Sequence, residues 1–198
     1  GYSLHKQRFP LSIATEYMER DNATGSAGAN YTTLLQIVQK RTAKHPELVQ
    51  SNTTLAVHLR LGDVIDRTDK RTWYNASYTA HDFLHGNIYN LHGNIYVYPL
   101  SHYQRVLDLI EEQHIKIERV LLITGFHYET YHLNTYVYLN EMLRFFKSKG
   151  FSETVLRINE SPDDDVIVIA NSKHFVKAGG GYSNVLAHLV NMTGGVVW

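Results

Sequence analysis

The chain has 198 residues and no cysteine, and its 19 Lys and Arg residues equal its 19 Asp and Glu residues in number. A hydrophobic fraction of 43% over this length is typical of one globular domain with a sizeable core. The balanced charge gives no sign of a nucleic-acid or membrane partner, and the lack of cysteine excludes disulfides, thiolate catalysis and cysteine zinc sites.

Two features of the sequence point to different compartments. The lack of cysteine slightly favours the cytoplasm, whereas six Asn-x-Ser/Thr sequons are compatible with the secretory pathway. These sequons begin at Asn22, Asn30, Asn52, Asn75, Asn159 and Asn191. No apolar run is long enough for a membrane span. The first residue is not Met, which is compatible with the removal of an upstream segment. We divide the chain into a helical and loop segment over residues 1–54 and a main domain over residues 55–198.

The elements alternate along the chain. Residues 1–29 are polar and predict a loop, and the stretch 66–98, with its repeated His-Gly-Asn-Ile-Tyr, predicts a long loop or a hairpin. Apolar runs predict strands at 55–59, 120–123, 154–158 and 174–178, and periodic patterns predict helices at 31–41, 102–113, 135–149, 163–171 and 183–190. Ser101 and Gly150 are expected to cap two of these helices.

This alternation predicts an α/β fold with a mainly parallel, Rossmann-like sheet and helices on both faces. Ligands of such sheets bind at the carboxyl ends of the strands. Three groups of residues fall at such ends, and they carry the functional argument.

The first group is His58-x-Arg60-x-Gly62-Asp63, directly after a buried strand. Arg60 can donate two hydrogen bonds to a diphosphate, and Gly62 lets the backbone turn close to a ligand. A strand that simply ends in a solvated arginine and a Gly-Asp turn explains the pattern equally well.

The second group is the run Gly179-Gly180-Gly181-Tyr182-Ser183, which joins a strand to a helix. Backbone N–H groups and the positive end of a helix dipole can bind a phosphate there, and Ser183 can add a hydroxyl or cap the helix. The run has neither the Lys-Ser/Thr of a P-loop nor a complete Gly-x-Gly-x-x-Gly, so it favours neither an ATPase nor a dinucleotide enzyme. A tight connection without a ligand is the alternative.

The third group is Asp163-Asp164-Asp165 after Pro162. Acidic residues there usually begin a helix, where the dipole favours them. We interpret Asp163 and Asp164 in that way, and Asp165 as a contact to the nucleoside.

Together, the three groups resemble the fucosyltransferase superfamily that contains α-1,2-, α-1,6- and protein O-fucosyltransferases. The resemblance extends over residues from about 55 to 189. The residues that carry it are His58-x-Arg60-x-Gly62-Asp63, Leu100-Ser101-His102-Tyr103, Leu121-Leu122-Ile123-Thr124 and Asp165-x-x-Val168-Ile169-x-x-Ser172-Lys173-His174-Phe175. The pattern is closest to that of α-1,2-fucosyltransferases.

The resemblance implies a GT-B glycosyltransferase that uses a GDP-sugar without a metal. Residues 55–198 would then be its nucleotide-sugar-binding, Rossmann-like domain, and residues 1–54 are compatible with the remnant of a truncated acceptor domain. Arg60 would contact the diphosphate, His58 would shape that site, and Asp165 would lie near the nucleoside. The donor would also contact Thr124, Gly125, Gly180, Gly181, Tyr182 and Ser183. Two departures matter: Thr124-Gly125-Phe126-His127 stands where members often have Ser-Asp-Asp, and residues 180–185 stand where they often have Ser-Ser-Phe-Ser-Trp-Trp.

We therefore expect transfer of a sugar, fucose from GDP-fucose, to a glycan hydroxyl, with Asp63 or Asp66 as a candidate base and the tyrosine-rich stretch from Tyr74 to Tyr98 as a candidate acceptor loop. A different donor, such as UDP-xylose, and a non-catalytic nucleotide- or glycan-binding module are the alternatives. The 12 histidines are scattered and form no His-Glu-x-x-His pattern, so we expect no metal site.

Overall fold

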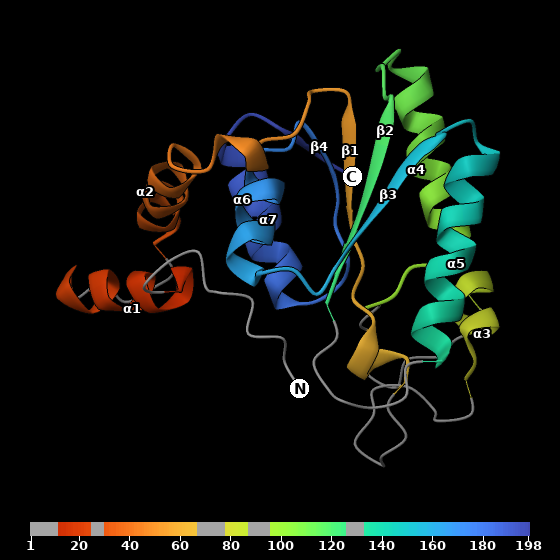
Figure 1. Cartoon of the computed structure of the whole chain (residues 1–198), viewed down its shortest axis with the longest axis horizontal. Coiled ribbons are helices and arrows are strands. Elements are labelled where there is room, and N and C mark those ends of the chain that lie inside the picture. Colours follow the sequence, from red (N-terminus) through yellow and green to blue (C-terminus); the bar gives the residue numbers. More distant parts are fainter. Residues whose placement is uncertain (1–11, 25–29, 67–77, 87–95, 126–132) are drawn as a thin grey trace.

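A computed structural model describes residues 12–24, 30–66, 78–86, 96–125 and 133–198, without the side chains of 19–24 and Asp63. Five strands form one parallel sheet in the order β3-β2-β1-β4-β5 (Figure 1). The strands are β1 (Thr54–His58), β2 (Arg119–Thr124), β3 (Glu153–Ile158), β4 (His174–Val176) and β5 (Val196–Val197). This is the strand order of a Rossmann sheet without its sixth strand, so the predicted α/β fold is confirmed.

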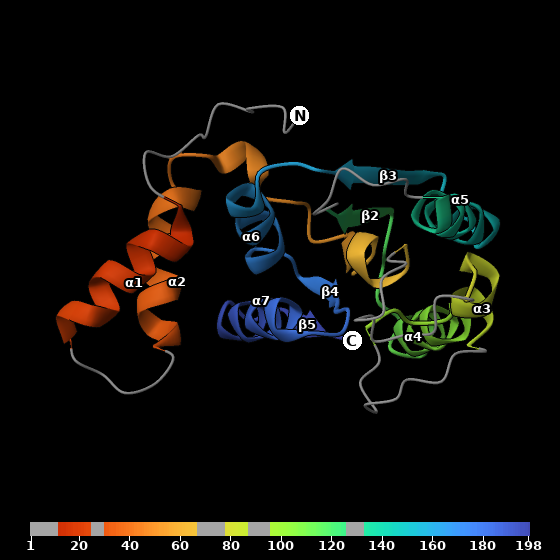
Figure 2. The same ribbon diagram turned by 90° about the horizontal axis from the view of Figure 1, so that it is seen from below.

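Helices cover both faces of the sheet, as the edge-on view shows (Figure 2). One face carries α3 (Ala80–His85), α4 (Leu100–Glu112) and α5 (Leu133–Ser148), and the other carries α6 (Pro162–Ala170) and α7 (Gly181–Met192). The helix α2 (Tyr31–Thr42) packs on the outer side of α6 and α7. Side chains alternate along each strand. In β1, Leu55 and Val57 pack with α4 and α5, whereas Ala56 packs with α6 and α7. His58 therefore points to the face of α7.

The predicted strands and long helices are confirmed to within a few residues, and Gly150 ends α5 with a φ of 93°. Three local predictions are wrong, and one strand was not predicted. Residues 13–24, within the predicted loop, form α1 (Ile13–Thr24), and α3 lies in the stretch predicted as loop or hairpin. Ser101 lies inside α4, whose N-cap is Pro99. The short strand β5 was not predicted, because two valines give too little pattern to recognise.

A mostly buried ion network attaches the N-terminal helices to the sheet domain. Arg41 of α2 donates to Asp163 of α6 and to Glu16 of α1, each at 2.8 Å. The backbone N–H of Ile13 donates to both carboxylate oxygens of Asp163, at 3.1 and 3.0 Å. Ile37 of α2 is fully buried in the core around α6 and α7. Asp163 therefore serves as the anchor of α1 and α2.

Within the described part of the chain, no helix is long and apolar enough to cross a membrane.

Candidate functional site

The sheet order places a crevice between the carboxyl ends of β1 and β4. After β1 the chain passes through α4 to β2 and then to β3, which both lie on one side of β1. It then returns through α6 to β4, which lies on the other side of β1. Adjacent loops therefore diverge at this point, and in open α/β sheets ligands bind in such crevices. The first and second residue groups identified in the sequence both end here.

The turn after β1 is held firmly against α5. Gly62 adopts a left-handed φ of 61°, and its N–H donates to the buried Thr135 Oγ1 at 3.0 Å. Asp66 accepts from the backbone N–H groups of Asn134 at 2.7 Å and Thr135 at 3.0 Å. Both Asp66 oxygens therefore satisfy first-turn donors of α5, which is the role of a helix cap rather than of a base. The Asp63 side chain lies outside the described residues. The half-buried Arg60 leaves β1 just before this turn.

The structure brings His58 and Ser183 together, 125 residues apart in sequence. His58 Nδ1 lies 3.2 Å from Ser183 Oγ, and that oxygen accepts the backbone N–H of Ala178 at 2.9 Å. Ser183 is fully buried, and among the described residues its hydroxyl has no acceptor other than His58 Nδ1. The hydroxyl therefore donates to Nδ1, which leaves the imidazole proton on Nε2.

His58 is a neutral donor in this arrangement. Burial, with a smaller contribution from the nearby Arg60 charge, lowers the pKa of His58 from 6.5 to about 4. The ring edge also packs against Tyr182, with centroids 5.5 Å apart. At neutral pH, His58 supplies one N–H and no charge.

The glycine run forms the turn between β4 and α7. Gly179 N–H donates to the carbonyl of Tyr96 at 3.2 Å. Gly180 is the N-cap of α7 and has a φ of 96°, a region that favours glycine. A Cβ on Gly180 would lie 3.4 Å from the Tyr96 ring. The helix begins at Gly181, so the prediction that Ser183 caps it is wrong, because Ser183 lies inside the first turn.

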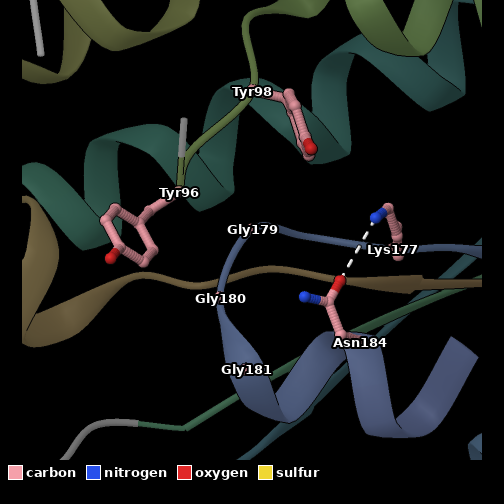
Figure 3. Close-up of a pocket in the computed structure, with 7 residues that line it drawn as sticks. All are labelled: Tyr96, Tyr98, Lys177, Gly179, Gly180, Gly181 and Asn184. Atoms are coloured by element: carbon pink, nitrogen blue, oxygen red, sulfur yellow. Dashed lines mark hydrogen bonds between the residues drawn. The ribbon is translucent and has the colours of Figure 1, made fainter. Parts of the chain in front are cut away.

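A pocket of about 360 Å³ opens at this turn (Figure 3). The three glycines form its floor beside the start of α7, and Tyr96 and Tyr98 lie across from them. Its full lining is Tyr96, Tyr98, Lys177, Gly179, Gly180, Gly181 and Asn184. Tyr98 is fixed by stacking on His102, with centroids 4.2 Å apart, and its carbonyl accepts the Tyr138 hydroxyl at 2.5 Å. The pocket walls are therefore preformed.

Other predicted donor contacts lie along the same sheet edge but do not line this pocket. Thr124 ends β2, and its buried hydroxyl has no hydrogen-bond partner among the described residues. Gly125 follows it, and a Cβ there would meet Asn159 Oδ1 only at 4.0 Å. The Tyr182 hydroxyl donates to the Pro162 carbonyl at 3.4 Å, so this ring points to the start of α6.

Asp165 is already engaged by a protein partner. Its Oδ1 accepts from Arg157 Nε at 2.6 Å. Burial nevertheless raises the pKa of Asp165 to about 6, because desolvation outweighs the opposing effect of Arg157. A contact from Asp165 to a nucleoside would involve its second oxygen.

Sequence reasoning missed two pocket residues, Lys177 and Asn184. Lys177 directly follows β4, and its Nζ donates to Asn184 Oδ1 at 3.2 Å (Figure 3). The available signal was a lysine two residues before the glycine run. Of the candidate acceptor loop, residues 74–77 and 87–95 lie outside the described part, whereas Tyr96 and Tyr98 lie at the pocket.

No protein-family model matches this chain, and no curated protein matches it either. Among the described residues, no group of three or more His, Asp or Glu side chains could hold a metal ion.

Proposed function

We propose that this chain binds a nucleotide sugar and transfers its sugar to a hydroxyl of a glycan, with GDP-fucose as the first donor to test. The observation that carries the proposal is the convergence of the His58-x-Arg60 turn and the Gly179–Ser183 turn at the crevice between β1 and β4. The sequence resemblance to fucosyltransferases supports the choice of sugar.

In the proposed step, the acceptor hydroxyl oxygen forms a bond to the anomeric carbon of the donor. The bond between that carbon and the β-phosphate oxygen breaks, and the diphosphate leaves with the electron pair. The hydroxyl proton passes to a base, for which Asp63 is the candidate, because both oxygens of Asp66 cap α5.

The residues at the crevice suit the charge that develops on the leaving diphosphate. The Arg60 guanidinium supplies positive charge, and the N–H groups of the first three residues of α7 have no intrahelical acceptor. His58 adds a neutral N–H without changing the net charge. The proposed reaction needs no metal, because these groups supply the stabilisation.

The direct test is sugar transfer by an Arg60→Ala variant, measured with GDP-fucose and UDP-xylose against a panel of glycan acceptors. We expect kcat/KM to fall at least about a hundredfold, as it does when one preorganised donor to a developing oxyanion is removed. Arg144→Ala is the matched control, since Arg144 is exposed on α5 and pairs with Glu141, three residues away on the same helix. Undiminished turnover in Arg60→Ala would remove Arg60 from the mechanism.

The same panel separates an enzyme from a binding module. Binding of a nucleotide sugar without turnover on any acceptor would identify a non-catalytic module, and turnover with UDP-xylose alone would change the donor.

A further inference from the structure

The pocket at the glycine turn combines two positive groups. The Lys177 ammonium is held by Asn184 Oδ1 at 3.2 Å, and Asn184 belongs to the first turn of α7. The N-terminus of a helix carries a partial positive charge of about half a unit. An anion between the ammonium and this helix end would be attracted by both.

Among the described residues that line the pocket, none is Asp or Glu. The positive end of a helix favours acidic side chains, and α6 carries three of them in its first turn, whereas α2, α4 and α5 carry none. The first turn of α7 carries none. This local excess of positive charge indicates an anionic ligand.

The shape of the pocket fits a compact anion attached to a larger group. Its volume of about 360 Å³ lies in the range of small-molecule sites. A Cβ on Gly181 would meet nothing within 4 Å, so the backbone there faces open space. In Figure 3 the Lys177 side chain and the Tyr98 ring lie on the same side of the glycine turn.

We propose that Lys177 is a second cation, besides Arg60, that binds the diphosphate of the donor, and that Asn184 holds its ammonium in place in this pocket. Non-bridging phosphate oxygens accept from Lys177 Nζ on one side and from first-turn N–H groups of α7 on the other. This assignment rests on the proposed function. Lys177 lines this pocket and Arg60 does not, so the assignment gives the diphosphate a contact in addition to the one proposed for Arg60.

The test measures binding of inorganic pyrophosphate and of GDP by calorimetry, in the full chain and in Lys177→Met. We expect affinity for both ligands to fall at least about tenfold, with a shallower dependence on salt because one ion contact is lost. Lys177→Arg keeps the charge and is expected to retain most of the affinity. Lys173→Met is the matched control, since exposed Lys173 lies four residues upstream and donates to the Gly194 carbonyl at 3.2 Å.

The possible results separate this assignment from the proposed function. Equal affinities in the parent and in Lys177→Met would overturn the role of Lys177 while leaving nucleotide-sugar transfer intact. Pyrophosphate binding that depends on Lys177, without transfer from any nucleotide sugar, would support the anion site and overturn the transferase. A parent chain that binds neither pyrophosphate nor GDP would contradict both.

Discussion

Neighbouring glycines in the turn before α7 have different physical roles. Gly180 adopts a φ of 96°, so its backbone conformation favours glycine, whereas a Cβ there would meet the Tyr96 ring only at 3.4 Å. Gly181 is not among the residues with positive φ, and a side chain there would project into open space at the pocket. The sequence gives no difference between the two glycines. In the structure, the backbone conformation favours glycine at Gly180, whereas at Gly181 a side chain would enter the pocket.

This difference predicts that substitution affects ligand binding at Gly181 and stability at Gly180. Gly181→Val should remain folded and weaken GDP binding at least about tenfold, or about 1.4 kcal/mol, because its side chain occupies the pocket. Gly180→Ala should instead lower the free energy of unfolding by about 1–2 kcal/mol. Calorimetric binding and urea unfolding of both variants check this. Unchanged GDP affinity in Gly181→Val would reduce the turn to a simple connection.

His58 gives a pH dependence of stability. Its pKa is near 6.5 when unfolded and about 4 when folded, so below pH 6.5 the unfolded chain binds a proton that the native state does not. The free energy of unfolding should therefore fall as the pH is lowered from about 6.5 to 4, by up to about 3 kcal/mol from this group. Asp165, whose pKa is raised to about 6, opposes this trend in the same range.

Comparison with His58→Asn isolates the histidine, since Asn can still accept from Ser183 and Asp165 is present in both proteins. We expect the parent to lose more stability than His58→Asn between pH 7 and pH 4.5 in urea unfolding. Parallel pH profiles would show that His58 titrates normally in the folded chain.

At the scale of elements, two aspartates at the start of α6 have different structural partners. Asp163 binds Arg41 and the Ile13 N–H, which secures α1 and α2, whereas Asp165 pairs with Arg157 of β3. The sequence correctly indicated that Asp163 has a structural role at a helix start. It gave no sign of Arg41, because that partner lies 122 residues away.

Loss of the Asp163 carboxylate should therefore affect stability more than ligand binding. We expect Asp163→Ala to lower the free energy of unfolding by about 3 kcal/mol, because the mostly buried Arg41 loses one of the two carboxylates that it contacts among the described residues. Diphosphate affinity should stay within about twofold of the parent. Glu141→Ala, which breaks an exposed pair with Arg144, is the control and should cost less than about 1 kcal/mol. A large loss of affinity in Asp163→Ala would place this residue at the ligand instead.

At the scale of the whole molecule, the site depends on the order of the strands. β1 lies between β2 and β4, so the turn after β1 meets the glycine turn only because the chain crosses back through α6. A different strand order would separate His58 from Ser183 while leaving every local motif unchanged. The crevice is thus a property of topology and not of either motif.

The sequence by itself determined the elements and their alternation, because apolar periodicity and glycines at turns are local signals. It also placed His58, Arg60 and the glycine run at carboxyl ends of strands, which was sufficient to predict one sheet edge. Only the tertiary structure decided which partners each residue has. Ser183 became the partner of His58 rather than a helix cap, Asp66 became a cap of α5, and Lys177 joined Asn184 in the pocket. Such pairings depend on how separate elements pack, and packing distances are not encoded in local periodicity.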